Sequence, residues 1–308
     1  MRRTRVLFLG EKPLALQCLR LLVSSPGVEV VGVGTRPARD RWWGDDGIVA
    51  ECRRLGIPIV PRERLSDMHC DLLISVLYPF IVDKTVIRTA VRGAFNLHEA
   101  PLPRWRGCNG CSHAILSGDA EYATTLHEMS AQLDSGRIVA EKRFAIRPQE
   151  TARELYERTS RCSLELATEW FPRLVSGDYT LQDQSTEIER FTNARDSLLP
   201  WKRLPPTMAI GEAVRRIRAL DFVPWEPAYV ETPLGPFYLY IANSSGRSDD
   251  ACAHAVEADP WQRLGDINWT DRSWWMIQGT WRPIMVCRVP DYEDRYPLKG
   301  RSAIGCHV

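Results

Sequence analysis

Phe95-Asn-Leu-His-Glu-Ala-Pro-Leu-Pro-Arg-Trp-Arg-Gly107 joins the end of an apolar run to a proline-rich turn. We interpret residues 95–98 as the end of a β-strand. Because successive side chains of a strand point to opposite faces, Asn96 and His98 then lie on the same face. The stretch therefore predicts a strand that carries two polar side chains to one side of a sheet.

Before this stretch, short β-rich runs alternate with amphipathic helices. Strands are predicted at residues 5–9, 28–33, 58–60 and 71–77, and helices at 13–23 and 47–55. Strands spaced by helices imply right-handed βαβ units and parallel pairing. We therefore predict an α/β fold with a Rossmann-like, mostly parallel sheet.

After the stretch, the pattern indicates a helix at 109–117 and strands at 124–129 and 137–146 that extend the sheet. A long helix follows from Thr151, which with Glu154 three residues later has the signature of a capping box. Gly177 and Asp178 end this helix. The first half of the chain is thus a continuous alternation of strands and helices.

The composition changes near residue 190. Prolines at 200, 205 and 206 mark a linker, and a helix is predicted at 211–220, followed by short β-like runs at 228–231, 237–241, 274–278 and 283–288. Seven of the eleven tryptophans lie beyond residue 200. We predict a catalytic domain at residues 1–189 and a smaller, mainly β domain at 190–308, whose tryptophans form either a core or a homodimer surface.

Charge and cysteine content narrow the class of protein. The 308 residues carry a net charge of +1, which argues against a protein devoted to nucleic acid. Nine scattered cysteines fit reduced thiols, and no run approaches the ~20 apolar residues of a membrane span. The pair Cys108 and Cys111 lacks a second pair at ligand spacing, so we expect no metal and a cytoplasmic location.

A second stretch supplies a carboxylate. Thr124-Thr-Leu-His-Glu-Met-Ser-Ala-Gln-Leu-Asp-Ser-Gly136 ends in a tight turn that contains Asp134. An amide donor can stabilise an oxyanion, and an imidazole with a carboxylate can move a proton. Asn96, His98 and Asp134 together therefore predict an acyl-transfer site.

These two stretches resemble a known family. The Asn-x-His…Leu-Pro-x-x-Arg-Gly block and the Leu-Asp-x-Gly loop are similar to those of folate-dependent formyltransferases, most strongly over residues 71–146. The sugar-amine branch, including the domain that formylates UDP-4-amino-arabinose, is the nearest likeness. The resemblance implies that N10-formyltetrahydrofolate is the co-substrate and that Asn96, His98 and Asp134 are catalytic.

The same resemblance suggests where the two substrates bind. The family holds the pterin ring largely by backbone groups after the fourth strand and before the catalytic Asp. Around the acceptor, the guanidinium groups beside the catalytic His could face an anion or pair with an acid such as Glu99. His127 is expected to make a structural or substrate-side contact. The predicted donor-binding residues are Tyr78, Pro79, Phe80, Ile81, Val82 and Ser130, and the predicted acceptor-binding residues are Arg104, Trp105, Arg106 and His127.

The acceptor amine is less well defined. Methionyl-tRNA formyltransferases grip RNA with basic surfaces, whereas residues 35–44 hold only three arginines and acids are mixed among the later basic residues. We therefore favour the amine of a UDP-, dTDP- or GDP-linked aminodeoxysugar. Initiator tRNA and other small amines remain alternatives. A folate-pocket protein that has lost turnover is a further alternative, against which the three polar residues argue.

Overall fold

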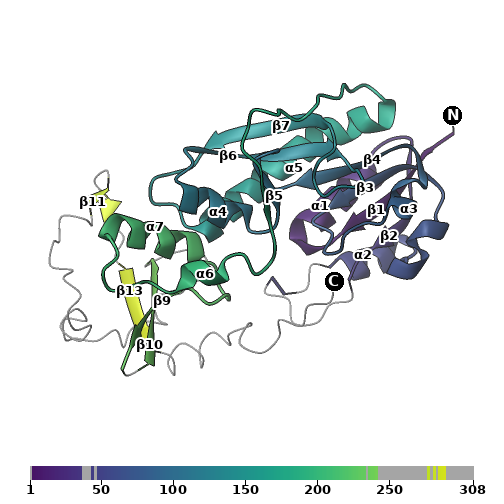
Figure 1. Ribbon diagram of the computed structural model, residues 1–308. Helices are drawn as coiled ribbons and strands as arrows, with labels where there is room; N and C mark the ends of the chain where they lie inside the picture. Colours follow the sequence, from purple (N-terminus) through teal and green to yellow (C-terminus); the bar gives the residue numbers. More distant parts are fainter. Residues whose placement is uncertain are drawn as a thin grey trace. The chain divides into compact units, whose positions relative to one another are not determined.

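The computed structural model describes residues 2–36, 43–44, 47–233 and 235–241, with the backbone of 276–277, 280–281 and 284–288 (Figure 1). The chain divides into two compact units. The first comprises Met1–Cys108, Tyr122–Phe144 and Arg158–Asn193, and the second comprises Asn109–Glu121, Ala145–Glu157 and Ala194–Val308. The predicted domain boundary between residues 189 and 190 stays a prediction.

A six-stranded sheet in the order β2-β1-β3-β4-β6-β7 organises the first unit. Its first four strands pair in parallel, and β6 pairs antiparallel to β4. The predicted α/β class with a mostly parallel sheet is therefore confirmed. The strands are β1 (Thr4–Gly10), β2 (Val28–Gly34), β3 (Cys70–Val76), β4 (Ala90–His98), β6 (Glu121–Glu128) and β7 (Ile138–Ala145).

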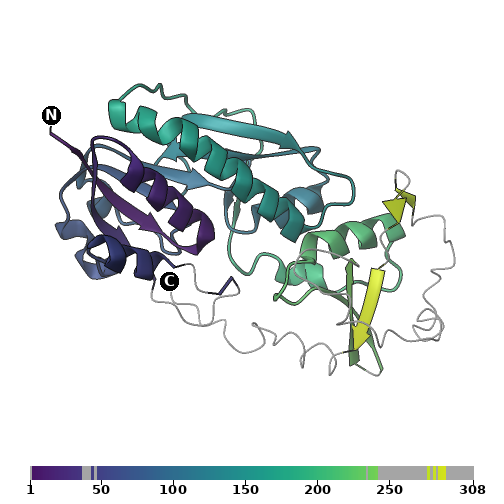
Figure 2. The same cartoon turned by 180° about the vertical axis from the view of Figure 1, so that it is seen from behind.

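Helices α1 (Lys12–Ser24) and α5 (Ala152–Ser176) cover one face of this sheet, as Figure 2 shows. Their buried leucines pack with Phe95 and Leu97 of β4 in one core. The other face packs against the 3-10 helix η1 (Arg62–Asp67) and α3 (Lys84–Ile87). Since Phe95 and Leu97 face α1 and α5, the alternating residues Asn96 and His98 face the opposite side.

Shorter elements complete the first unit. Helix α2 (Ile48–Leu55) follows β2, and β5 (Trp105–Gly107) pairs in parallel with β8 (Phe191–Asn193). The pair β5 and β8 has no periodic signal in the sequence, because each strand is three residues long. The strand predicted at 58–60 is instead a single bridge between Ile59 and Val33.

The second unit has a separate core. Helix α7 (Ile210–Leu220) packs through Ala213 and Ile217 on a three-stranded antiparallel sheet in the order β13-β10-β9. This sheet confirms the β character predicted for the C-terminal region, although most residues beyond 241 lie outside the described part. The remaining elements are α4 (Gly110–Ser117), α6 (Leu199–Lys202), β9 (Ala228–Thr232), β10 (Gly235–Ile241), β11 (Met276–Ile277), β12 (Thr280–Trp281) and β13 (Ile284–Arg288).

The capping box at the start of α5 has the predicted form. Glu154 accepts a hydrogen bond from the Thr151 amide at 2.9 Å, and the Glu154 amide donates to Thr151 Oγ1 at 3.3 Å. These reciprocal bonds satisfy amides that a helix start leaves unpaired.

Of the described helices, none is long and apolar enough to cross a membrane.

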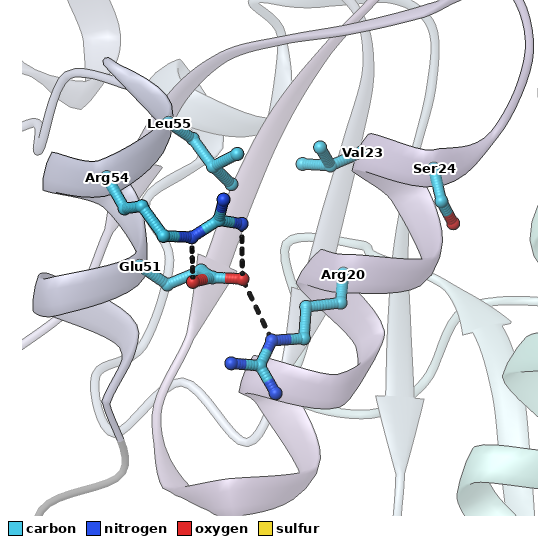
Figure 3. A pocket seen from close by; sticks show the side chains of 6 residues that line it. All are labelled: Arg20, Val23, Ser24, Glu51, Arg54 and Leu55. Carbon is cyan, nitrogen blue, oxygen red and sulfur yellow. Dashed lines mark hydrogen bonds and ion pairs between the residues drawn. The ribbon is translucent and has the colours of Figure 1, made fainter.

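An open hollow of about 480 Å³ lies between α1 and α2 (Figure 3). Its centre is Glu51, which accepts hydrogen bonds from Arg54 at 2.8 and 3.1 Å and from Arg20 at 2.9 Å. Hydrogen bonds from Arg54, then Arg20, lower the pKa of Glu51 to about 2. The six lining side chains include no predicted site residue, so this hollow is a helix-to-helix ion cluster.

Candidate active site

The site begins where β4 and β6 run side by side. In their antiparallel register Asn96 lies directly opposite His127, and His98 lies opposite Thr125. Directly opposed residues of a sheet project from the same face. The register therefore brings His127 to the face that already carries Asn96 and His98.

His127 has a defined protonation pattern. Its Nδ1 lies 2.7 Å from the carbonyl oxygen of Glu128, which can only accept, so Nδ1 carries the proton. Nε2 is then the acceptor for Asn96 Nδ2 at 3.3 Å. The side chain is 2 % exposed. Burial lowers the pKa of His127 to about 4, so the ring is neutral at pH 7.

A backbone carbonyl also fixes the tautomer of His98, in this case through Nε2. Its Nε2–H donates to the carbonyl oxygen of Trp105 at 2.9 Å. Nδ1 is therefore the basic nitrogen, and it lies 3.8 Å from Oδ2 of Asp134. Backbone carbonyls thus hold both imidazoles in tautomers that turn their basic nitrogens toward Asp134.

Asp134 lies in the loop between β6 and β7 with a φ of 47°, in the left-handed region. Its Oδ2 accepts a hydrogen bond from the Gly107 amide at 2.9 Å, and its Oδ1 lies 3.6 Å from His127 Nε2. Burial raises the pKa of this carboxyl, but the two histidines and the Gly107 amide reverse the effect, so its pKa lies below the ordinary value. The structure therefore brings the three predicted catalytic residues together.

The Asp134 loop has two further contacts that the sequence did not reveal. Gln184 donates through Nε2 to the carbonyl oxygens of Asp134 and Gly136, each at 2.8 Å. Arg106 Nη2 donates to Gln184 Oε1 at 2.5 Å. Gly136 allows the loop to approach β6, because a Cβ there would lie 2.0 Å from the Glu128 carbonyl oxygen. Gln184 is 50 residues from Asp134, so no local motif could have found it.

The predicted donor-binding segment follows β3. Tyr78 and Phe80 make an edge-to-face contact with ring centroids 5.5 Å apart, and the Arg62 guanidinium lies 4.7 Å from the Phe80 ring centroid. Ile81 is 73 % exposed beside them. Ser130 is exposed in the Asp134 loop, and its Oγ donates to the Gln132 carbonyl at 2.8 Å. Donor binding by Tyr78, Pro79, Phe80, Ile81, Val82 and Ser130 stays a prediction.

The predicted acceptor-binding residues differ in their surroundings. Trp105 is 3 % exposed and stacks on Phe191 at 4.8 Å, with the Arg104 guanidinium over both rings. Arg104 Nη1 also lies 3.8 Å from Glu189 Oε2. The acid that pairs with Arg104 is therefore Glu189, whereas the sequence suggested Glu99. Acceptor binding by Arg104, Trp105, Arg106 and His127 stays a prediction.

Glu99 is buried. Ser160 Oγ donates a hydrogen bond to its carboxyl at 2.7 Å, and burial raises its pKa.

Among the described residues no group of three or more His, Cys, Asp or Glu side chains could hold a metal ion.

Sequence comparison identifies the family. Residues 61–173 match the formyl transferase family. The methionyl-tRNA formyltransferase of Halorhodospira halophila is 30 % identical over 259 residues, which cover 80 % of this chain and 82 % of that protein. The chain therefore belongs to the formyltransferases, a family of folate-dependent one-carbon transferases.

Solved structures share the fold at lower identity. The N-formyltransferase of Helicobacter canadensis, in complex with folinic acid and dTDP-3-aminofucose, has a TM-score of 0.64 and 18 % identity, covering 79 % of this chain and 89 % of its own. The methionyl-tRNA formyltransferase of Clostridium thermocellum has a TM-score of 0.53 and 14 % identity, covering 79 % and 95 %. Both likenesses establish the fold of this chain.

Proposed function

We propose that this chain moves a formyl group from N10-formyltetrahydrofolate to the amine of a nucleotide-linked aminodeoxysugar. Formyl transfer from a folate is the chemistry of the family. The choice of acceptor rests on the resemblance to the sugar-amine branch, which implies a histidine at position 127. In this structure His127 contacts both Asn96 and Asp134, which places it beside the candidate catalytic residues.

The geometry supports a separate role in formyl transfer for each of the three candidate residues. One N–H of the Asn96 amide donates a hydrogen bond to His127. The second N–H is available to donate to the formyl oxygen, which becomes negative as the amine attacks. His98 Nδ1 can take the proton that the amine loses, because Nε2 is committed to Trp105. Asp134 stabilises the resulting imidazolium from 3.8 Å.

Donor binding is expected beside the end of β3. The exposed Ile81 and the half-buried rings of Tyr78 and Phe80 suit a flat heterocycle. Backbone groups of residues 78–82 would recognise its polar edge, as the family resemblance implies. The Asp134 loop, with Leu133 41 % exposed, would close the other side.

A small acceptor fits the charge near the site better than RNA does. Of the three arginines at residues 35–44, Arg36 forms an ion pair with the buried Glu11, with Nη2 and Oε1 2.6 Å apart. That pair reduces the positive charge available to a phosphate backbone. The other two arginines, 39 and 41, lie outside the described residues.

Initiator tRNA is the second candidate acceptor, and a specific observation favours it. Methionyl-tRNA formyltransferases match about three quarters or more of this chain at 25–30 % identity. Among solved structures the order is reversed, since two sugar N-formyltransferase structures have TM-scores of 0.62 and 0.65 and a methionyl-tRNA formyltransferase has 0.53. Similarity to known sequences favours tRNA as the acceptor, whereas surface charge and fold similarity favour a small acceptor, so the assay must offer both.

The test is a mass-spectrometric transfer assay with the full chain. N10-formyltetrahydrofolate is offered with UDP-, dTDP- and GDP-aminosugars in parallel with charged initiator tRNA, and a His98→Asn variant serves as the blank. Gain of one formyl mass on an aminosugar supports the proposal and names the acceptor. Formylation of the tRNA alone would overturn it.

A further inference from the structure

Gln184 connects the Asp134 loop to β5 through three hydrogen bonds. Both N–H groups of its amide are used, one on the Asp134 carbonyl and one on the Gly136 carbonyl, each at 2.8 Å. Its oxygen accepts from Arg106 Nη2 at 2.5 Å. An amide with both donors and its acceptor engaged has one preferred orientation.

The two anchors of Asp134 come from adjacent residues of β5. Gly107 donates its amide directly to the Asp134 carboxylate at 2.9 Å. Arg106 acts on the Asp134 backbone through Gln184. Arg106 is 8 % exposed and is hydrogen-bonded to Gln184, so its position is set by the protein interior rather than by solvent. Side chain and backbone of Asp134 are thus held from the same strand.

Catalysis is sensitive to this placement. The carboxylate lies 3.8 Å from His98 Nδ1 and 3.6 Å from His127 Nε2, so a small shift of the loop changes both separations. A misplacement of about 1 Å can cost on the order of 100-fold in rate. The loop itself offers little apolar anchorage, since Leu133 is 41 % exposed and Ser130 and Ser135 bond within the loop.

We propose that Gln184 is a positioning residue for formyl transfer, whose amide holds the Asp134 loop in register with His98 and His127. The proposal rests on the formyl-transfer chemistry of the family and not on the identity of the acceptor amine. Gln184 does not touch the reacting atoms in this scheme. Its effect reaches them only through the backbone of Asp134.

The decisive variant is Gln184→Glu. It keeps the length and the acceptor for Arg106 but replaces the amide donor with an oxygen that repels the carbonyls of Asp134 and Gly136. The matched control is Gln182→Glu, which makes the same chemical change at an exposed position two residues earlier. A second variant, Gln184→Met, removes the donors without adding charge.

Two readouts separate positioning from general stability. Amide hydrogen exchange on the protein alone reports the loop, through peptides that cover residues 128–137 and the Gly107 amide that bonds Asp134. Steady-state kinetics with whichever amine the wild type accepts report kcat and the donor KM separately. The exchange measurement needs no acceptor, so it decides the loop contact even if the proposed aminosugar is not a substrate.

We expect both Gln184 variants to exchange faster at these peptides and to lose about 10- to 100-fold in kcat, with the donor KM changed less than about 3-fold. Gln182→Glu should match the wild type in both readouts. Wild-type exchange at residues 128–137 and Gly107 in both Gln184 variants would overturn the proposal. So would a loss confined to the melting temperature with kcat unchanged.

Discussion

His127 Nε2 lies 3.6 Å from one oxygen of Asp134, and His98 Nδ1 lies 3.8 Å from the other. Each imidazole donates its N–H to a backbone carbonyl, so both basic nitrogens turn toward the same carboxylate. A carboxylate between two basic nitrogens stabilises a proton on either ring. The arrangement differs from a simple pair of acid and base, because a second imidazole faces the shared carboxylate.

His127 should make the protein sensitive to mild acid. Burial lowers its pKa from 6.5 to about 4 in the folded chain, so the unfolded chain takes up the proton first as the pH falls. His127 should therefore contribute a decrease in the free energy of unfolding from pH 6.5 toward pH 4, on the order of 3 kcal/mol at 1.36 kcal/mol for each pKa unit. Glu99, whose pKa burial raises, acts in the opposite direction and is kept unchanged in all variants. His127→Gln should flatten this decrease, as followed by denaturant unfolding at several pH values.

The control for that experiment is His69→Gln, at an exposed position. It should leave the pH dependence of unfolding as in the wild type. An equally steep decrease in the His127→Gln variant would contradict the assignment of the acid sensitivity to this ring. His113, whose pKa burial also lowers, contributes in the same direction and is kept unchanged in all variants.

Asn96 should matter for rate more than for binding. Asn96→Ala removes the amide N–H that is available for the developing oxyanion, and loss of one such donor costs about 100- to 1,000-fold in kcat. The donor KM should change little, because the residues predicted to bind the folate lie after β3. Rate and folate binding are measured on the same preparation. An unchanged kcat would exclude Asn96 as the oxyanion donor.

His98 and Asp134 should act as one unit. His98→Asn and Asp134→Asn should each reduce kcat by about 1,000-fold or more, and the double variant should be no slower than the slower single variant. The reason is that the carboxylate serves the reaction only through the imidazole it stabilises. A double-mutant cycle on kcat measures the coupling. Fully multiplicative losses would instead mean that the two residues act independently.

Local pattern together with the family resemblance predicts three candidate catalytic residues. Asn96 and His98 share a face because a strand alternates, and Asp134 sits in a recognisable Asp-Ser-Gly turn. The contact between Asn96 and His127 depends on the register of β4 and β6, which no motif specifies. Gln184 and Arg106 are 78 residues apart in the sequence, and their hydrogen bond forms only in the folded chain. No local pattern could therefore predict it.

Gly107→Ala tests the contact between β5 and the Asp134 carboxylate against a matched glycine. Gly107 has a φ of 80° and a Cβ there would lie 2.4 Å from the Asn193 carbonyl oxygen, whereas Gly56 has a φ of 68° and no atom within 4 Å. Both alanine variants carry the cost of a left-handed residue, about 1–2 kcal/mol. Only Gly107→Ala adds a clash, which should cost about 1–3 kcal/mol more.

The two variants should also differ in activity. Relief of the clash moves the Gly107 amide away from Asp134 Oδ2, which it now bonds at 2.9 Å, so Gly107→Ala should lose kcat while Gly56→Ala keeps it. Denaturant unfolding and formyl transfer are measured side by side for both. Equal stability loss in the two variants would show that β8 yields to the added methyl. In that case the Gly107 amide would keep its hydrogen bond to Asp134, and kcat would be unchanged in both variants. This result would contradict the view that β5 is a rigid support of the carboxylate.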